Sequence, residues 1–323
     1  MRYFIELSYD GTAYHGWQIQ PNGSSVQETL QRALSLLLRE EVTVTGAGRT
    51  DAGVHAAMMV AHVDIEAPLP APPVGGRAAQ PMSSSSSQEY KEVLPPVGGR
   101  AAQPMSSSSS QEYKEVLPPV GGRAAEPMSS SSSQEYKEVL PPTGGVREGP
   151  PERNLVYRLN GILPHDIAIH RIYPVADDMH ARFSALARTY YYYVHTRKSP
   201  FLRDRSWRLV KTPDFEAMNR AAATLLEYED FTSFSKVNTD TKTNICHVRS
   251  ARWVQLSDYE WRFEITADRF LRNMVRAIVG TLMEVGRGQL SLDGFRKVIE
   301  DKNRSAAGDS VPARGLFLQN VEY

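Results

Sequence analysis

The sequence has few of the features that mark secreted, membrane or metal-thiolate proteins. It contains one cysteine, Cys246, in 323 residues, so neither an intrachain disulfide nor a cysteine-rich metal site can form. No apolar run approaches the roughly 20 residues that a membrane-spanning helix requires. The first residues, MRYFIELSYDG, alternate like a strand and lack the apolar core of a signal peptide. We therefore expect a soluble protein of the reducing cytoplasm, with no membrane partner.

The sequence also lacks an excess of charge of either sign. Its 37 lysine and arginine residues equal its 37 aspartate and glutamate residues. A protein that coats nucleic acid through its overall charge would be basic, so any nucleic-acid site must be a local patch. Hydrophobic residues make up 41% of the chain, which at this length is enough to bury the cores of two ordinary domains.

A nearly identical repeat interrupts the sequence. The unit PPVGGRAAQPMSSSSSQEYKEVL begins at Pro72, Pro95 and Pro118, 23 residues apart, and a fourth copy ends after PPTGG. Proline, glycine, serine and charged residues dominate this unit, so it offers too little apolar surface to offset the entropy of ordering its backbone. We predict that residues 68–151 form a disordered low-complexity insert. The alternative is a peptide docking site, with the VLPP segment in a polyproline helix.

Outside the insert, the patterns predict two halves that each mix strands and helices. The first half comprises residues 1–67 and 152–178. An alternating strand near residues 3–9 precedes a helix that begins at a possible capping box, Ser25 with Glu28. Further strands are predicted at residues 42–44, 58–65 and 167–169, and a helix at residues 155–162.

The second half, residues 179–323, repeats this arrangement. Its predicted strands carry ARTYYYYV, the segments around Trp253 and Trp261, and GLFLQNVEY. Helices are predicted after Pro213, at about residues 270–285 and near Leu292 to Ile299. Because the alternation lacks the steady rhythm of a doubly wound sheet, we predict an α+β fold. In it, two ferredoxin-like (RRM-like) halves share an extended, mostly antiparallel sheet.

A glycine-rich turn, GAGRTDAGVHA, contains Asp51. A nucleotide-binding G-x-G-x-x-G loop is disfavoured because Asp51 stands at its third glycine, where a carboxylate would repel phosphate. An aspartic protease would need a second such triplet, and His55 and His62 lack partners at metal-ligand spacing. Arg49 nearby favours an ionised carboxylate that could act as nucleophile or base. Taken alone, however, such an aspartate is more often a turn former.

The run of four tyrosines has two interpretations. On a strand, Tyr190 and Tyr192 face one side of the sheet and Tyr191 and Tyr193 the other. One pair could pack in the core while the other covers a sheet edge. Alternatively, the tyrosines form an aromatic platform on which an extruded base stacks.

Three arginines recur at helical spacing. Arg269, Arg272 and Arg276 stand at i, i+3 and i+7, so they are predicted on one face of the helix at 270–285. A solvated face is the usual explanation, but no acidic residue alternates with them. Arg276 lies among apolar residues, where an unpaired guanidinium is costly. We therefore expect a buried or ligand-borne anion beside it.

Four segments resemble, in order, signature segments of the TruA family of tRNA pseudouridine synthases. They are GAGRTDAGVHA, FSALARTYYYYV, FLRNMVRAIVGTLMEVGRG and ARGLFLQNVEY. The resemblance covers nearly everything outside the insert. At the position of the insert, the family usually has a short connector. It implies isomerisation of uridine to pseudouridine in the anticodon stem-loop of tRNA. It also implies a homodimer that uses neither a metal nor an organic cofactor.

The resemblance also implies roles for particular residues. Asp51 would be the catalytic aspartate and Arg276 its partner. Tyr190 would stack on the target uracil and help to remove the proton from C5, and Arg49 would hold the flipped nucleotide and its phosphate. The other substrate-binding residues expected are Arg188, Arg269, Arg272 and Leu316.

The alternative function is a non-catalytic RNA-binding module of the same fold. A pure binder would gain nothing from a carboxylate that repels phosphates, so Asp51 favours the enzyme. The chemistry fits this choice, because a uracil cannot be turned within a stem and must be flipped into a pocket.

Overall fold

The structure, a computed structural model, describes residues 1–66, 151–236 and 242–323. The predicted insert lies outside the described residues except for its last position. Within these ranges, no helix has the length and apolar character needed to cross a membrane.

The first half contains the strands and helices that the patterns predict. They are β1 (Arg2–Tyr9), α1 (Val26–Leu38), β2 (Val44–Gly46), β3 (His55–Asp64), α2 (Pro151–Ile162) and β4 (Ile167–Val175). Ser25 caps α1 by accepting a hydrogen bond from the Glu28 backbone at 3.2 Å, which is one half of the predicted capping box. The strand predicted at 58–65 begins earlier, at His55, because its pairing with β9 starts there.

The second half also follows the predicted order. Its elements are β5 (Ala187–His195), β6 (Trp207–Arg208), α3 (Phe215–Thr224), β7 (Val248–Ser257), β8 (Glu260–Ala267), α4 (Met274–Gly286), α5 (Leu292–Glu300) and β9 (Leu316–Glu322). On α3, Met218, Ala221 and Ala222 are fully buried, as the helical spacing predicts.

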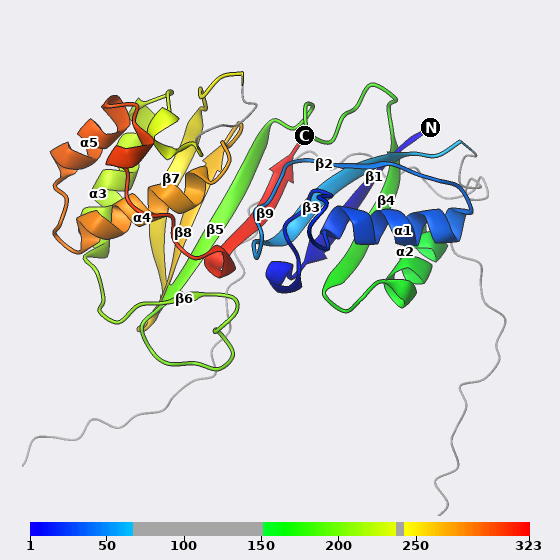
Figure 1. The fold of residues 1–323 in the computed structure, drawn as a ribbon, viewed down its shortest axis with the longest axis horizontal. Helices are drawn as coiled ribbons and strands as arrows, with labels where there is room; N and C mark the ends of the chain where they lie inside the picture. Colours follow the sequence, from blue (N-terminus) through cyan, green and yellow to red (C-terminus); the bar gives the residue numbers. More distant parts are fainter. Residues whose placement is uncertain (67–150, 237–241) are drawn as a thin grey trace, which may run out of the picture. The chain divides into compact units, whose positions relative to one another are not determined.

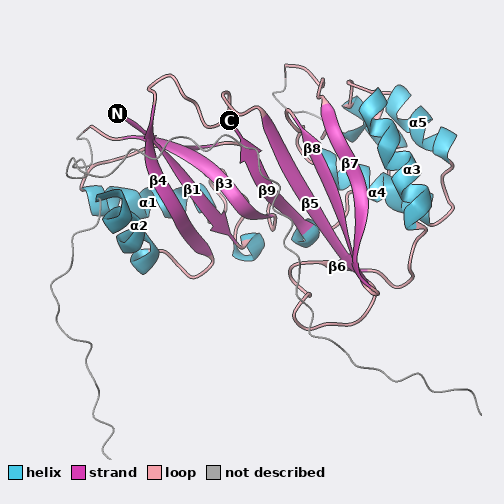
Figure 2. Cartoon of the chain, turned by 180° about the vertical axis from the view of Figure 1, so that it is seen from behind, coloured by secondary structure: helices cyan, strands magenta, loops and turns pink. Residues whose placement is uncertain are grey.

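One nine-stranded sheet joins the two halves, which confirms the predicted α+β class. Its order is β4-β1-β3-β9-β5-β8-β7, with β2 on β3 and β6 on β5. Pairing is antiparallel except between β3 and β9 and between β5 and β6. The labelled helices cover one face of this sheet (Figure 1), and the strands lie in front when the fold is seen from behind (Figure 2).

The C-terminal strand β9 contributes to the core of each half. Leu316 packs with the second-half core, whereas Leu318 and Val321 pack with the core built around β1, β3 and α1. The described residues belong to one compact unit. The division of the chain at residue 178 therefore stays a prediction.

The arginine row predicted on one helix face is wrong in part. Helix α4 begins at Met274, because Asn273 adopts the left-handed conformation with φ 68° and so interrupts any helix before it. Arg269 and Arg272 consequently lie in the preceding loop, and of the three arginines only Arg276 is on α4.

Candidate active site

Asp51 lies in a tight turn between β2 and β3. The backbone N–H of Val54 donates to the Asp51 carbonyl at 3.1 Å. Gly53 has φ 75°, a conformation that other residues rarely adopt, and its N–H donates to the Tyr14 carbonyl at 3.2 Å. The turn thus requires glycine two residues after the aspartate.

The segment between β1 and α1 holds this turn from one side. A Cβ atom at Gly16 would lie 2.3 Å from the carbonyl oxygen of Thr50, so only glycine permits this approach. The hydroxyl groups of Tyr9 and Thr50 are 2.9 Å apart, and both residues are buried. These contacts fix the backbone of Asp51 and therefore the position of its carboxylate.

Two arginines approach the carboxylate of Asp51. Arg276 Nη1 lies 3.2 Å from Oδ2, and its Nε donates to the Val311 carbonyl at 2.7 Å. The Arg276 and Asp51 side chains are 20% and 25% exposed, so this ion pair is largely shielded. Arg272 Nε stands 3.9 Å from Oδ1, and its side chain is 56% exposed. Asp51 is therefore the anion that the apolar setting of Arg276 leads us to expect.

Tyr190 on β5 lies near this carboxylate. Its ring packs edge-on against Phe270, with ring centroids 5.1 Å apart. Burial raises the pKa of Tyr190 to about 12, and the negative charge of Asp51 adds to the rise. Tyr190 is consequently a neutral phenol at neutral pH.

The four tyrosines divide between the two faces of the sheet as predicted. Tyr192, on the same face as Tyr190, is fully buried and its hydroxyl donates to the Pro312 carbonyl at 2.8 Å. On the other face the Arg262 guanidinium lies 4.2 Å from the Tyr191 ring centroid. The core interpretation therefore holds for Tyr192, while Tyr190 remains half-buried beside Asp51.

Arg188 is bound to protein rather than free for a substrate. Its Nη1 donates to the carbonyls of Ala185 and Asp268, at 3.3 and 2.7 Å. Its Nη2 donates to the carbonyls of Ala47 and Arg182, at 3.0 and 2.5 Å. These four bonds use all four Nη hydrogens. The expectation that Arg188 binds substrate directly does not fit these contacts, because the guanidinium has no paired donors left for a phosphate.

The other predicted substrate-binding residues differ in their surroundings. Arg49 is exposed and Arg269 is half-buried, and neither forms an ion pair with an acidic residue in the described ranges. Leu316 is 6% exposed and packs in the second-half core. Phe270 was not among the predicted site residues, because its contact with Tyr190 joins the β8–α4 loop to a strand 80 residues earlier.

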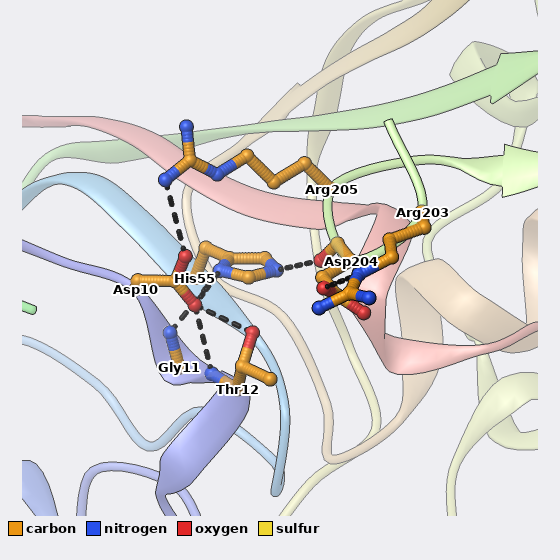
Figure 3. Close-up of polar contacts among 7 residues, drawn as sticks. All are labelled: Asp10, Gly11, Thr12, His55, Arg203, Asp204 and Arg205. Atoms are coloured by element: carbon orange, nitrogen blue, oxygen red, sulfur yellow. Dashed lines mark hydrogen bonds and ion pairs between the residues drawn. The ribbon is translucent and has the colours of Figure 1, made fainter. Parts of the chain in front are cut away.

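A buried histidine ties a surface loop to the strand that follows Asp51. His55 Nδ1 accepts from the Gly11 backbone at 3.1 Å, so Nε2 carries the proton and donates to the Asp204 carbonyl at 3.0 Å. Burial lowers the pKa of His55, and the ring is neutral although Asp10 lies 3.2 Å from Nδ1. Figure 3 shows this arrangement, with Arg205 reaching the other oxygen of Asp10. These contacts anchor the start of β3.

The family profile and the related proteins that match this chain share one description. A profile described as tRNA pseudouridine synthase matches residues 7–84 and 221–323. The tRNA pseudouridine synthase A of Bacteroides thetaiotaomicron is 46% identical, over 100% of this chain and 90% of its own. That of Bacteroides fragilis is 45% identical, over 100% and 96%. The Bacillus subtilis protein of the same name is 30% identical, over 100% and 99%.

Proposed function

Because the chain belongs to the tRNA pseudouridine synthase family, we propose that it isomerises uridine in tRNA with Asp51 as the reacting carboxylate. The reaction breaks the bond between C1′ and N1, turns the uracil, and joins C5 to C1′. A proton leaves C5 and N1 ends protonated, so substrate and product are isomers. The base must leave its stack for this rotation.

The geometry of the Asp51 carboxylate carries the proposal. Arg276 holds Oδ2 at 3.2 Å, while Oδ1 accepts no hydrogen bond from a described residue and faces Arg272 at 3.9 Å. An oxygen with free lone pairs is what a carboxylate needs, whether it attacks C1′ or removes a sugar proton. Oδ1 is therefore the reacting atom, and Arg276 holds the carboxylate in place.

Tyr190 stacks on the target uracil and takes part in removing the proton from C5. Its ring is half-buried beside Phe270, so it offers a fixed aromatic surface. Because the pKa of Tyr190 is about 12, the phenol cannot accept the C5 proton without passing on its own hydroxyl proton. The ring therefore stacks on the base, and the hydroxyl takes part in proton transfer.

The substrate proposal rests on unpaired positive charge and on the family resemblance. Arg49 and Arg269 form no ion pair with an acidic residue in the described ranges, and Arg272, 3.9 Å from Asp51 Oδ1, is 56% exposed; all three can neutralise RNA phosphates around Asp51. We assign the anticodon stem-loop as the target and a homodimer as the working form, as the resemblance implies. We also assign a cytoplasmic location, because a sequence with one cysteine has no intrachain disulfide of the kind common in secreted proteins.

The test is an assay of the full-length protein on unmodified tRNA transcripts, with pseudouridines mapped by carbodiimide treatment and primer extension. We expect new stops in the anticodon stem-loop and none after incubation without protein. Tight binding without any new pseudouridine would favour the non-catalytic RNA-binding module instead. Stops confined to another arm of the tRNA would contradict the assigned target.

A further inference from the structure

The Arg188 guanidinium brings together three segments that are far apart in the sequence. Its hydrogen bonds reach the carbonyls of Ala47, Arg182 and Asp268. Each segment carries an arginine at or just after the bonded residue: Arg49, Arg182 itself, and Arg269. A structural arginine therefore assembles a cluster of three others, which we call the arginine cluster.

The arginine cluster is not neutralised within the protein. None of its three members forms an ion pair with an acidic residue in the part of the chain that the structure describes. Burial lowers the pKa of Arg182, and the positive charges of Arg49 and Arg269 lower it further. A polyanion bound at the cluster would relieve the repulsion among the three guanidinium groups.

An exposed aromatic side chain adjoins the cluster. Phe183 is 75% exposed as a residue, although large apolar side chains are usually buried. His180 packs on it with ring centroids 4.4 Å apart, and the Arg182 guanidinium lies 5.5 Å from its centroid. Both the Arg182 and Phe183 backbone N–H groups donate to His180 Nδ1. The ring is thus held in place with much of its surface open to solvent.

We propose that Arg182 and Phe183 form a second nucleotide-binding position beside the target uridine. Arg182, together with Arg49 and Arg269, binds the RNA backbone, and the open surface of Phe183 stacks on an unpaired neighbouring base. A phosphate beside a base is the ligand that matches adjacent guanidinium and aromatic groups. This inference rests on the proposed function and adds two residues to it.

A second copy of this chain is the other occupant that an exposed phenylalanine could suggest. In a symmetric dimer the same patch meets itself, so the arginine clusters of the two copies would repel each other. RNA supplies the opposite charge without that cost. The charge of the cluster therefore favours RNA over a partner subunit.

The test compares Arg182→Ala and Phe183→Ala with the wild type in full-length protein, using a tRNA transcript as the probe. Dissociation constants are measured over a series of salt concentrations. Arg182→Ala should weaken binding about tenfold and reduce the slope of log Kd against log salt by about 0.7–0.9, the value for one phosphate contact. Phe183→Ala should weaken binding about tenfold with the slope unchanged, because stacking releases no counterion.

Matched controls separate these effects from nonspecific ones. Arg220→Ala removes an exposed arginine from α3, and Tyr157→Ala removes an 82% exposed aromatic from α2. Both should leave binding and salt slope unchanged. Phe183→Trp should restore affinity and show fluorescence quenching by RNA beyond that of the wild type.

Two results would overturn the inference while leaving the proposed function intact. One is wild-type tRNA affinity in both alanine variants of an active enzyme. The other is a change of oligomeric state in Phe183→Ala with unchanged tRNA affinity, which would assign the ring to a subunit interface. Absence of pseudouridine formation by the wild type would instead refute the proposed function.

Discussion

Replacing Arg188 by methionine should destabilise the protein strongly, because four backbone carbonyls would lose their donor. A hydrogen bond from a charged donor contributes about 1.5–3 kcal/mol. Ala47 is buried and its carbonyl cannot readily exchange to water; we count it and the Asp268 carbonyl at about 2 kcal/mol each. The bond to Ala185 is long, at 3.3 Å, and the bond to Arg182 is exposed to solvent, so these two count for about 0.5 kcal/mol each. The free energy of unfolding should therefore fall by about 5 kcal/mol.

Equilibrium unfolding in urea measures this loss directly. Arg188→Lys should recover about half of it, because an ammonium group has three donors on one atom and cannot span four carbonyls. Arg249→Met is the matched control: it removes a half-exposed ion pair with Glu322 and should cost less than about 1 kcal/mol.

The outcome distinguishes a structural arginine from a substrate-binding one. A structural role would be contradicted if Arg188→Met had the unfolding free energy of the wild type while the slope of log Kd against log salt for tRNA binding fell by the value for one phosphate contact. Arg188 would then bind RNA directly, as was predicted from the sequence.

Three further predictions concern other parts of the structure. Tyr190→Phe keeps the stacking ring, so tRNA affinity should stay within about twofold while pseudouridine formation slows about 100-fold; an unchanged single-turnover rate would exclude proton transfer through its hydroxyl. Burial lowers the pKa of His62 to about 4, so the unfolded chain takes up a proton that the folded chain excludes as pH falls from about 6.5 to about 4. The free energy of unfolding should fall by about 3 kcal/mol over that window, and His62→Asn should abolish this part of the fall in urea titrations. A Cβ at Gly280 would lie 1.8 Å from the Asp309 carbonyl oxygen, so Gly280→Ala should lower the unfolding free energy by about 3 kcal/mol. Gly161→Ala on α2 meets no described atom within 4 Å and should raise it by about 0.5–1 kcal/mol; equal effects would contradict this reasoning.

Local patterns in the sequence were enough to predict most elements of the fold. The alternation in β1 and the spacing of Met218, Ala221 and Ala222 on α3 each mark a face that packs in a core, although Phe4 on the other face of β1 is also buried. The start of α4 was misplaced because the periodic apolar residues continue through Leu271 into the preceding loop, where the residue is buried without being helical. The left-handed conformation of Asn273 leaves no mark in that periodicity.

The candidate site was harder to predict than the fold, because it is formed by contacts between residues that are distant in the sequence. The apolar neighbours of Arg276 predicted an anion, yet its identity as Asp51 follows from a contact across 225 residues. The arginine cluster could not be foreseen, because Arg182 meets Arg49 and Arg269 only through the carbonyls that Arg188 gathers. The substrate-binding role predicted for Arg188 took no account of its backbone partners, because the carbonyls of Ala47 and Asp268 come from distant parts of the sequence.

The most direct test of the central claim is the Asp51→Asn variant in single-turnover assays on a tRNA transcript. The amide preserves the shape of the carboxylate and removes its charge and its reactive oxygen. We predict tRNA affinity within a few-fold of wild type and no detectable pseudouridine. Product formed at the wild-type rate would contradict the assignment of Asp51 as the reacting group.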